Sequence, residues 1–105
     1  MNRIDARELL ASLQGRVIPT LTGRPNRVLR LDGETVIVAT NRSPLGRPVP
    51  IAWIQSALDR LVEERVVDIS VESVGFRSAF VGAVLAQVPG AIAGHGAVRL
   101  RAGVT

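Results

Sequence analysis

The segment GFRSAFVGAVLAQVPG, residues 75–90, begins with the polar pair Arg77 and Ser78 near its head and is almost entirely apolar after it. Such a run, closed by a Pro-Gly pair, predicts a helix from about Arg77 to Val88. A cation in the first turn opposes the helix dipole, at a cost of about 0.3–1 kcal/mol. A bound phosphate would offset this repulsion, because the first turn presents unpaired N–H groups and the Ser78 hydroxyl adds a donor. The pair therefore indicates a phosphate anchor.

A second basic segment is NRSPLGRPVP, residues 41–50, in which Arg42, Ser43 and Arg47 surround a Ser-Pro-x-Gly turn signature. Its three prolines predict a rigid loop. An arginine held in place before its ligand arrives loses less entropy on binding, and the guanidinium group matches phosphate oxygens in pairs. This loop is the second candidate contact for a phosphate.

These arginines also have interpretations that involve no ligand. Arg77 can pair with Glu72 or Asp68 inside the protein, and the arginines of the 41–50 loop can be solvated side chains of a simple connection. All 13 basic residues are arginine, which a GC-rich genome would produce without any functional cause. The net charge of +4 is compatible with nucleic-acid binding but does not require it.

Catalytic groups are scarce. The chain has one His and no Cys, Tyr or Lys, and its carboxylates are scattered. His95 lies between glycines, without a second His or a carboxylate pair at metal-binding spacing. The glycine-containing segments lack the spacing of a nucleotide-phosphate loop. We therefore expect a segment without catalytic activity, cofactor or metal site.

The elements that position the arginines follow from periodicity and turn signals. We predict a helix from the capping pair Asp5 and Glu8 to a stop at Gly15, a short extended piece around Val17 and Ile18, helices at 50–64 and 77–88, and strands at 27–31, 34–40, 66–71 and 98–102. Residues 70–74 are equally compatible with a short helix. Residues 91–96 are predicted to form a loop.

The dipeptide Asp32-Gly33 predicts a two-residue hairpin turn, because both central positions need positive φ. Counting back from this turn pairs Leu31 with Glu34, Leu29 with Val36 and Arg27 with Val38. The core face of the hairpin then consists of Leu29, Leu31, Val36 and Val38.

At 105 residues the chain is expected to form one domain, residues 1–105, with a modest core. No signal peptide or membrane-spanning run is evident and cysteine is absent, which favours a cytoplasmic protein. The sequence ends two or three residues after its last predicted strand, which suggests the N-terminal domain of a longer protein, with a naturally short chain as the alternative.

The residues RSPLGRPVPIAWIQSALDRL and VGFRSAFVGAVLAQVPGA resemble the N-terminal module of bacterial HNH nucleases of the McrA-like, modification-dependent restriction type. The resemblance covers roughly residues 15 to 100. It implies a domain that docks on double-stranded DNA, with modified bases such as 5-methylcytosine among the features it could read, ahead of a separate nuclease domain. The matching polar positions near the DNA are Arg42, Ser43, Arg47, Arg77 and Ser78.

The pattern IxVESVGFRSAFVGAVL also resembles a winged-helix core, with Gly75 in the turn and the helix from Arg77 in the recognition position. On this basis we expect an α+β fold with a three-helix, winged-helix-like core, an added hairpin and a small antiparallel sheet. The predicted function is non-catalytic binding of duplex DNA, with phosphates held by the arginines and limited base contact in the major groove. The helix offers apolar side chains there, suited to a C5-methyl group. The alternative is a protein-interaction or structural domain.

Overall fold

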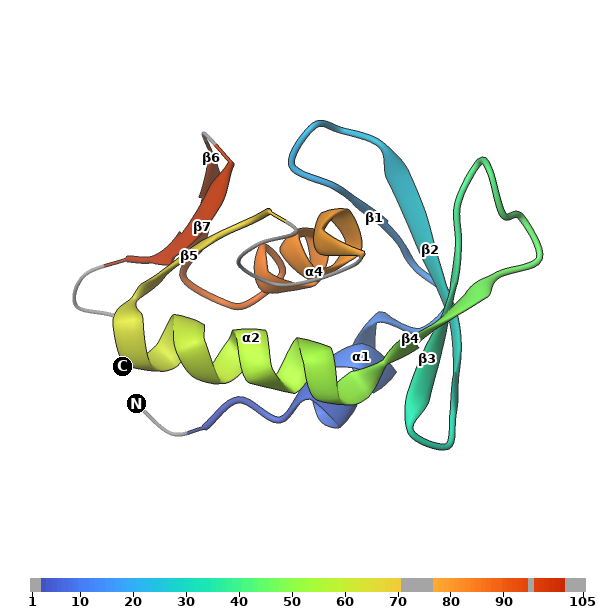
Figure 1. Cartoon of the computed structure of the whole chain (residues 1–105), viewed down its shortest axis with the longest axis horizontal. Helices are drawn as coiled ribbons and strands as arrows, with labels where there is room; N and C mark the ends of the chain where they lie inside the picture. The colour runs from blue at the N-terminus through green and yellow to red at the C-terminus, as the bar shows by residue number, and fades with distance from the viewer. Residues whose placement is uncertain (1–2, 71–76, 95, 102–105) are drawn as a thin grey trace.

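The computed structural model describes residues 3–70, 77–94 and 96–101, which form three helices and two antiparallel sheets (Figure 1). The elements in chain order are α1 (Ala6–Leu13), β1 (Val17–Pro19), β2 (Pro25–Asp32), β3 (Thr35–Ala39), β4 (Arg47–Pro50), α2 (Ile51–Glu64), β5 (Val66–Asp68), α4 (Ser78–Leu85), β6 (Ala91–Gly94) and β7 (Ala97–Leu100). The strand order is β1-β2-β3-β4 in the first sheet and β5-β7-β6 in the second. The predicted α+β class is confirmed.

The first two helices form where capping and periodicity predict them. The Asp5 carboxylate accepts a hydrogen bond from the backbone N–H of Glu8 at 3.0 Å and caps α1. Helix α2 starts directly after Pro50, whose φ of −60° suits the entry to a helix. Its buried stripe has the i, i+3, i+4, i+7 spacing of a core-facing helix and consists of Ile51, Ile54, Ala57, Leu58 and Leu61.

The turn of the β2–β3 hairpin lies one residue later than predicted. Asp32 pairs with Thr35, so the turn residues are Gly33 and Glu34. Gly33 has φ of +60°, whereas Asp32 keeps a negative φ. Glycine takes the turn position that needs positive φ at no steric cost, and Asp32 remains in the strand, where its carbonyl accepts a hydrogen bond from the Thr35 hydroxyl at 2.9 Å.

A β-bulge between Val28 and Arg30 then changes which β2 side chains face the core. Val28 pairs with Val38 and is fully buried, while Leu29, the residue predicted for this face, is only half-buried. The predicted burial of Val36 and Val38 is confirmed. The predicted pairs were wrong from the turn onward, since Leu31 pairs with Val36 rather than with Glu34. The displaced turn causes the first error, and the bulge, which has no reliable sequence signature, changes the register again.

The predicted rigid loop at 41–50 is shorter than expected, because residues 47–50 form strand β4. Its pairing with β3 places Val49 opposite Val36, and both side chains are fully buried. The two prolines of this strand lack the N–H group that a central strand requires. They are tolerated because β4 is an edge strand.

The C-terminal third also differs in detail from the prediction. Residues 91–94 form strand β6, which pairs with β7, where a loop was predicted. Helix α4 ends at Leu85, three residues early, and β7 covers 97–100 rather than 98–102. The segment of small residues at 91–94 has no alternation that would predict a strand. The predicted helix or strand at 70–74 lies largely outside the described residues.

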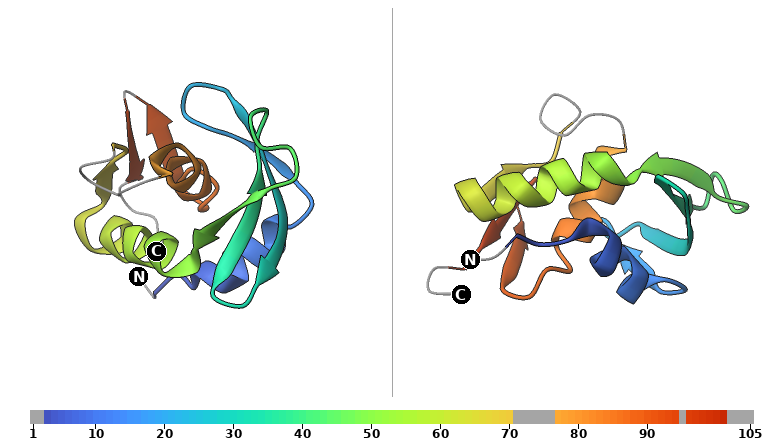
Figure 2. Two further views of the ribbon diagram at one scale, coloured as in Figure 1. Left: turned by 45° about the vertical axis from the view of Figure 1, so that its right-hand side comes forward. Right: turned by 90° about the horizontal axis from the view of Figure 1, so that it is seen from below.

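Helix α4 lies between the two sheets and is buried along most of its length. It packs against α2, against β1 of the first sheet and against β7 of the second, as the end-on view in Figure 2 shows. One hydrophobic cluster runs through both sheets and all three helices. Within the described residues, no helix is long and apolar enough to cross a bilayer.

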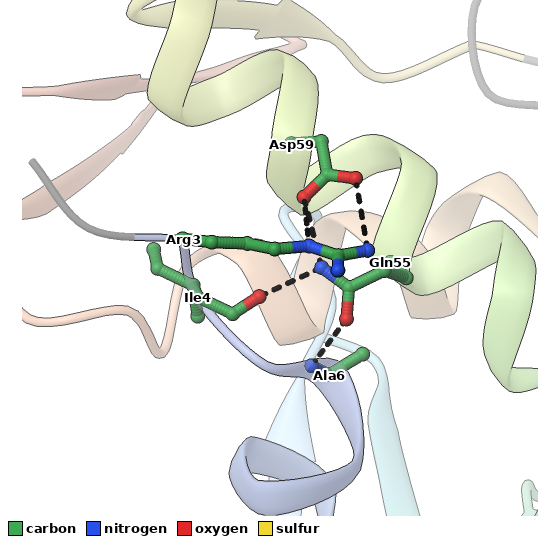
Figure 3. A network of polar contacts seen from close by, with 5 residues as sticks. All are labelled: Arg3, Ile4, Ala6, Gln55 and Asp59. Carbon is green, nitrogen blue, oxygen red and sulfur yellow. Dashed lines mark hydrogen bonds and ion pairs between the residues drawn. The ribbon is translucent and has the colours of Figure 1, made fainter.

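The segment before α1 is fastened to α2 by a polar network centred on Gln55 (Figure 3). The Gln55 side chain accepts a hydrogen bond from the Ala6 N–H at 2.8 Å and donates to the Ile4 carbonyl at 2.7 Å and to the Asp59 carboxylate at 2.9 Å. Arg3 forms an ion pair with Asp59 at 3.2 Å. The hydrogen bond from Gln55, together with Arg3, holds the pKa of Asp59 below its usual value of 3.8.

This network predicts a small loss of stability in acid. A carboxylate with a lowered pKa stabilises the folded state above its unfolded pKa, and the contribution is lost as the pH falls through the folded pKa. The unfolding free energies of the wild type and Asp59→Asn should therefore differ at pH 7 and converge below pH 3.8. Urea unfolding across this range measures the difference. If the unfolding free energies of the two proteins still differ at the lowest pH, the charge of Asp59 is not the cause of the difference.

Candidate functional site

Four of the five candidate residues line one open hollow, although they come from segments some thirty residues apart. Arg42, Ser43 and Arg47 belong to the β3–β4 connection, and Arg77 precedes α4. With Thr40 they line a hollow of about 520 Å³, which we call the arginine hollow. Three guanidinium groups around one open concavity can bind a phosphate or another polyanion.

The arginine hollow owes its shape to hydrogen bonds within the β3–β4 connection. The Ser43 carbonyl accepts from the N–H groups of Thr40 at 3.2 Å and Gly46 at 3.0 Å, and the Thr40 hydroxyl accepts from the Ser43 N–H at 3.1 Å. The Ser43 hydroxyl accepts from Nε of Arg47 at 3.2 Å. Ser43 therefore positions Arg47 as well as lining the hollow.

Gly46 closes this connection in a conformation that other residues avoid. Its φ is +95°, and a Cβ atom there would lie 2.6 Å from a methyl group of Ile37 and 2.9 Å from one of Leu29. The loop can therefore approach the sheet only with glycine at this position. Its neighbour Leu45 is 90% exposed.

Arg77 has a strained backbone at the start of α4. Its φ of 66° and ψ of 27° place it in the left-handed region, and its carbonyl accepts the hydrogen bond from the Val81 N–H at 3.0 Å. An arginine in this region costs about 1 kcal/mol or more. Among the described residues, Arg77 forms no ion pair, and of its two alternative partners Asp68 makes no contact of that kind while Glu72 lies outside the described residues.

Replacement of Arg77 by asparagine distinguishes a free arginine from an internally paired one. Asparagine tolerates the left-handed region, so we expect Arg77→Asn to raise the unfolding free energy by up to about 1 kcal/mol. Chemical denaturation measures this change, with Arg77→Lys as a control that keeps both the charge and the strain. A clear loss of stability in Arg77→Asn alone would show that the side chain has a stabilising partner within the protein.

Ser78, the fifth candidate, does not join the arginine hollow. It is half-buried and lines a separate hollow of about 180 Å³ with Thr20, Thr22 and Gly96 among others. The arginine hollow and this smaller hollow both reach the start of α4, because Arg77 lines the first and Ser78, the next residue, lines the second. Ser78 thus faces the other side of the same helix end.

The body of α4 is not available to read bases. The apolar side chains that we expected to face the major groove, Val81, Val84 and Leu85, are fully buried. The helix is covered by α2, by β1 of the first sheet and by β7 of the second. Gly82 packs closely against the residue that follows β5, since a Cβ atom there would lie 2.8 Å from a methyl group of Ile69. Ala79, in the first turn, is the exposed residue of the helix.

Charge is distributed unevenly around the molecule. The sequence ranges 9–31 and 35–58 contain six arginines and no carboxylate. Apart from Asp68, the described carboxylates lie at the start of α1, at the β2–β3 turn and on α2, along the lower side of Figure 1. The β1–β2 and β3–β4 connections lie on the upper side. A polyanion would therefore be attracted to the side that carries the arginine hollow.

A second hollow, of about 340 Å³, adjoins the first and was not anticipated from the sequence. Thr40 and Arg42 belong to both, and the other lining residues are Thr20, Arg24, Pro25, Asn26, Asn41 and Ala79. We call it the amide hollow. Asn26 is only 5% exposed, yet no described residue hydrogen-bonds to its side chain. The Asn26 amide is not fully shielded, because every fully shielded polar side-chain atom among the described residues has a partner.

The described residues contain no cluster of three His, Asp or Glu side chains that could hold a metal ion. His95 lies outside the described residues. The polar groups that do converge are guanidinium, amide and hydroxyl groups, and these bind anions and hydrogen-bonding edges.

Comparison with known proteins leaves this site to be interpreted on its own geometry. The chain matches no family model, no curated protein and no solved structure.

Proposed function

We propose that this domain binds double-stranded DNA and holds its phosphates with Arg42, Arg47 and Arg77. The observation that carries the proposal is the gathering of these three arginines around one open hollow, with no carboxylate among the described residues that line it. Guanidinium groups held in place before binding suit the repeated phosphates of a duplex. Ser43 orients Arg47, and Ser78 offers a donor on the adjoining side of α4.

The order of elements supports a winged-helix-like core. Helix α2 is followed by β5, by α4 and by the β6–β7 hairpin, with β7 in the middle of the three-stranded sheet. In this interpretation α4 holds the recognition position and the β6–β7 hairpin is the wing. Because α2 and strands of both sheets cover the body of α4, contact with DNA falls to the start of the helix and to the connecting loops.

The resemblance to McrA-like modification-dependent nucleases fits such a recognition module. We propose that the domain serves as the non-catalytic reader of a protein whose nuclease chemistry resides elsewhere, with modified duplexes among its ligands. The cytoplasm is the compartment in which such a reader meets DNA.

Titration of duplex binding against salt tests the proposal. If three arginines each neutralise one phosphate, the slope of log K against log [salt] is about −2.7, which is roughly a 40-fold loss of affinity between 50 and 200 mM salt. Fluorescence anisotropy with plain and 5-methylcytosine duplexes, and with the single strands, measures slope and preference together. Absence of duplex binding at 50 mM salt would overturn the proposal.

A protein-interaction domain is the second candidate, and Leu45 favours it. This side chain is 90% exposed at the tip of an ordered loop, a position at which a partner protein could bury it. A domain of this kind would bind no duplex at moderate salt, so the same titration separates the two functions.

A further inference from the structure

Asn26 occupies a position in β2 where an apolar residue is expected. The alternation of the strand turns Asn26 and Val28 to the same buried side. The backbone of Asn26 pairs with Ile18 in the sheet, whereas its side-chain amide has no partner among the described residues. A buried amide without a partner calls for a ligand or water.

The amide of Asn26 has access to the amide hollow. Every described side-chain nitrogen or oxygen that is fully shielded has a hydrogen-bond partner. The Asn26 amide has none, so it is not fully shielded, and Asn26 lines the amide hollow. Asn41, on the β3–β4 connection, brings a second amide to the same hollow. Its volume, about 340 Å³, lies within the usual range for sites of small organic ligands.

The amide hollow is continuous with the proposed phosphate site. Arg42 and Thr40 line both hollows. A phosphate held by Arg42 would therefore place its own nucleoside at the mouth of the amide hollow. Arg24 adds a second guanidinium group there.

The chemistry of the lining suits the edge of a nucleobase. A carboxamide presents one donor and one acceptor side by side, and this pair complements the adjacent donor and acceptor of a base edge. None of the described residues that line the amide hollow is aromatic, but guanidinium planes such as that of Arg24 also stack on bases. Specificity would then come mainly from hydrogen bonds to the edge.

We propose that the amide hollow binds a single nucleobase turned out of the duplex, with its edge on Asn26 and its phosphate on Arg42. The inference rests on the proposed duplex binding and supplies the base contact that the buried body of α4 cannot make. It replaces major-groove readout by that helix.

The test uses a duplex that carries 2-aminopurine, whose fluorescence rises when the base leaves the stack. We expect a several-fold rise on saturation with wild-type protein. A mismatch opposite the probe should tighten binding, because an unpaired base costs less to extrude. Asn26→Leu, similar in shape, should lose the fluorescence rise and the preference for the mismatch, with roughly 5- to 150-fold weaker binding of the mismatched duplex.

Two further measurements separate a binding role of Asn26 from a structural one. The thermal midpoint of Asn26→Leu should equal or exceed that of the wild type, since the amide has no partner in the fold, and the salt slope should be unchanged because the arginines remain. If this variant does not fold, Asn41→Leu, at an exposed position, should weaken the fluorescence rise without loss of stability.

Failure of this inference differs from failure of the proposed function. If the duplex binds in a salt-dependent way but the 2-aminopurine fluorescence stays quenched at saturation, base extrusion is wrong. The proposal of duplex binding then still stands. If no duplex binds at all, both duplex binding and base extrusion are wrong. A titration with deoxynucleoside monophosphates, followed by NMR of the Asn26 amide, then shows whether the amide hollow takes a free nucleotide instead.

Discussion

The double variant Arg42→Gln/Arg47→Gln is expected to bind duplex DNA with a salt slope lower by about 1.8, because two phosphate contacts are removed. Both side chains line the arginine hollow and neither forms an ion pair with a described residue. Their replacement by glutamine therefore leaves no buried charge unpaired, and stability should stay within about 0.5 kcal/mol of the wild type. Affinity would fall most at low salt.

The matched control is Arg16→Gln/Arg30→Gln. It makes the same change in net charge at exposed arginines that line neither hollow. Salt titrations of the two double variants by fluorescence anisotropy give the comparison. Equal slopes would mean that overall charge, rather than the arginine hollow, attracts the duplex, and the anchoring role of Arg42 and Arg47 would then be wrong.

Local signals predicted most of the helices but not the details of the sheets. The Asp5 cap and the apolar stripe of α2 depend on neighbours within a few residues, so periodicity was sufficient. The hairpin register depended on the displaced turn and on a bulge near Val28. Strands β4 and β6 pair with their chain neighbours β3 and β7, but their own residues, prolines in β4 and small residues in β6, have no strand pattern. Pairing of this kind is decided by the tertiary contacts of both partners.

The candidate site shows the same division. The residue types at Arg42, Arg47 and Arg77 pointed to a phosphate, but only the fold shows that they share one hollow. The sequence did not single out Asn26, because the segment 15–26 contains two Pro and two Gly and resembles an irregular connection. Asparagine is common in such connections. The alternation of strand β2 turns the Asn26 side chain inward. This alternation can be recognised only once β2 is known to begin at Pro25.

Gly46→Ala is expected to lower the unfolding free energy by about 2–5 kcal/mol, the largest loss of stability among the changes considered. The left-handed region costs a non-glycine residue about 1–2 kcal/mol, and the contacts of 2.6 and 2.9 Å with Ile37 and Leu29 add an overpacking cost of about 1–3 kcal/mol. The Ile37 methyl group belongs to a buried, β-branched side chain and has little room to move, whereas the half-buried Leu29 side chain can yield in part. Denaturation by urea measures the loss.

Gly23→Ala is the matched control for the steric part. Gly23 has φ of +89°, but a Cβ atom there would meet nothing within 4 Å, so this variant carries the backbone strain without the overlap. The difference between the two variants is the cost of moving the β3–β4 connection away from the sheet. Because Gly46→Ala keeps every arginine, its duplex affinity tests whether placement matters as well as charge. We expect weaker binding than in Gly23→Ala at a temperature where both are folded, and equal binding would show that the arginines act as mobile charges.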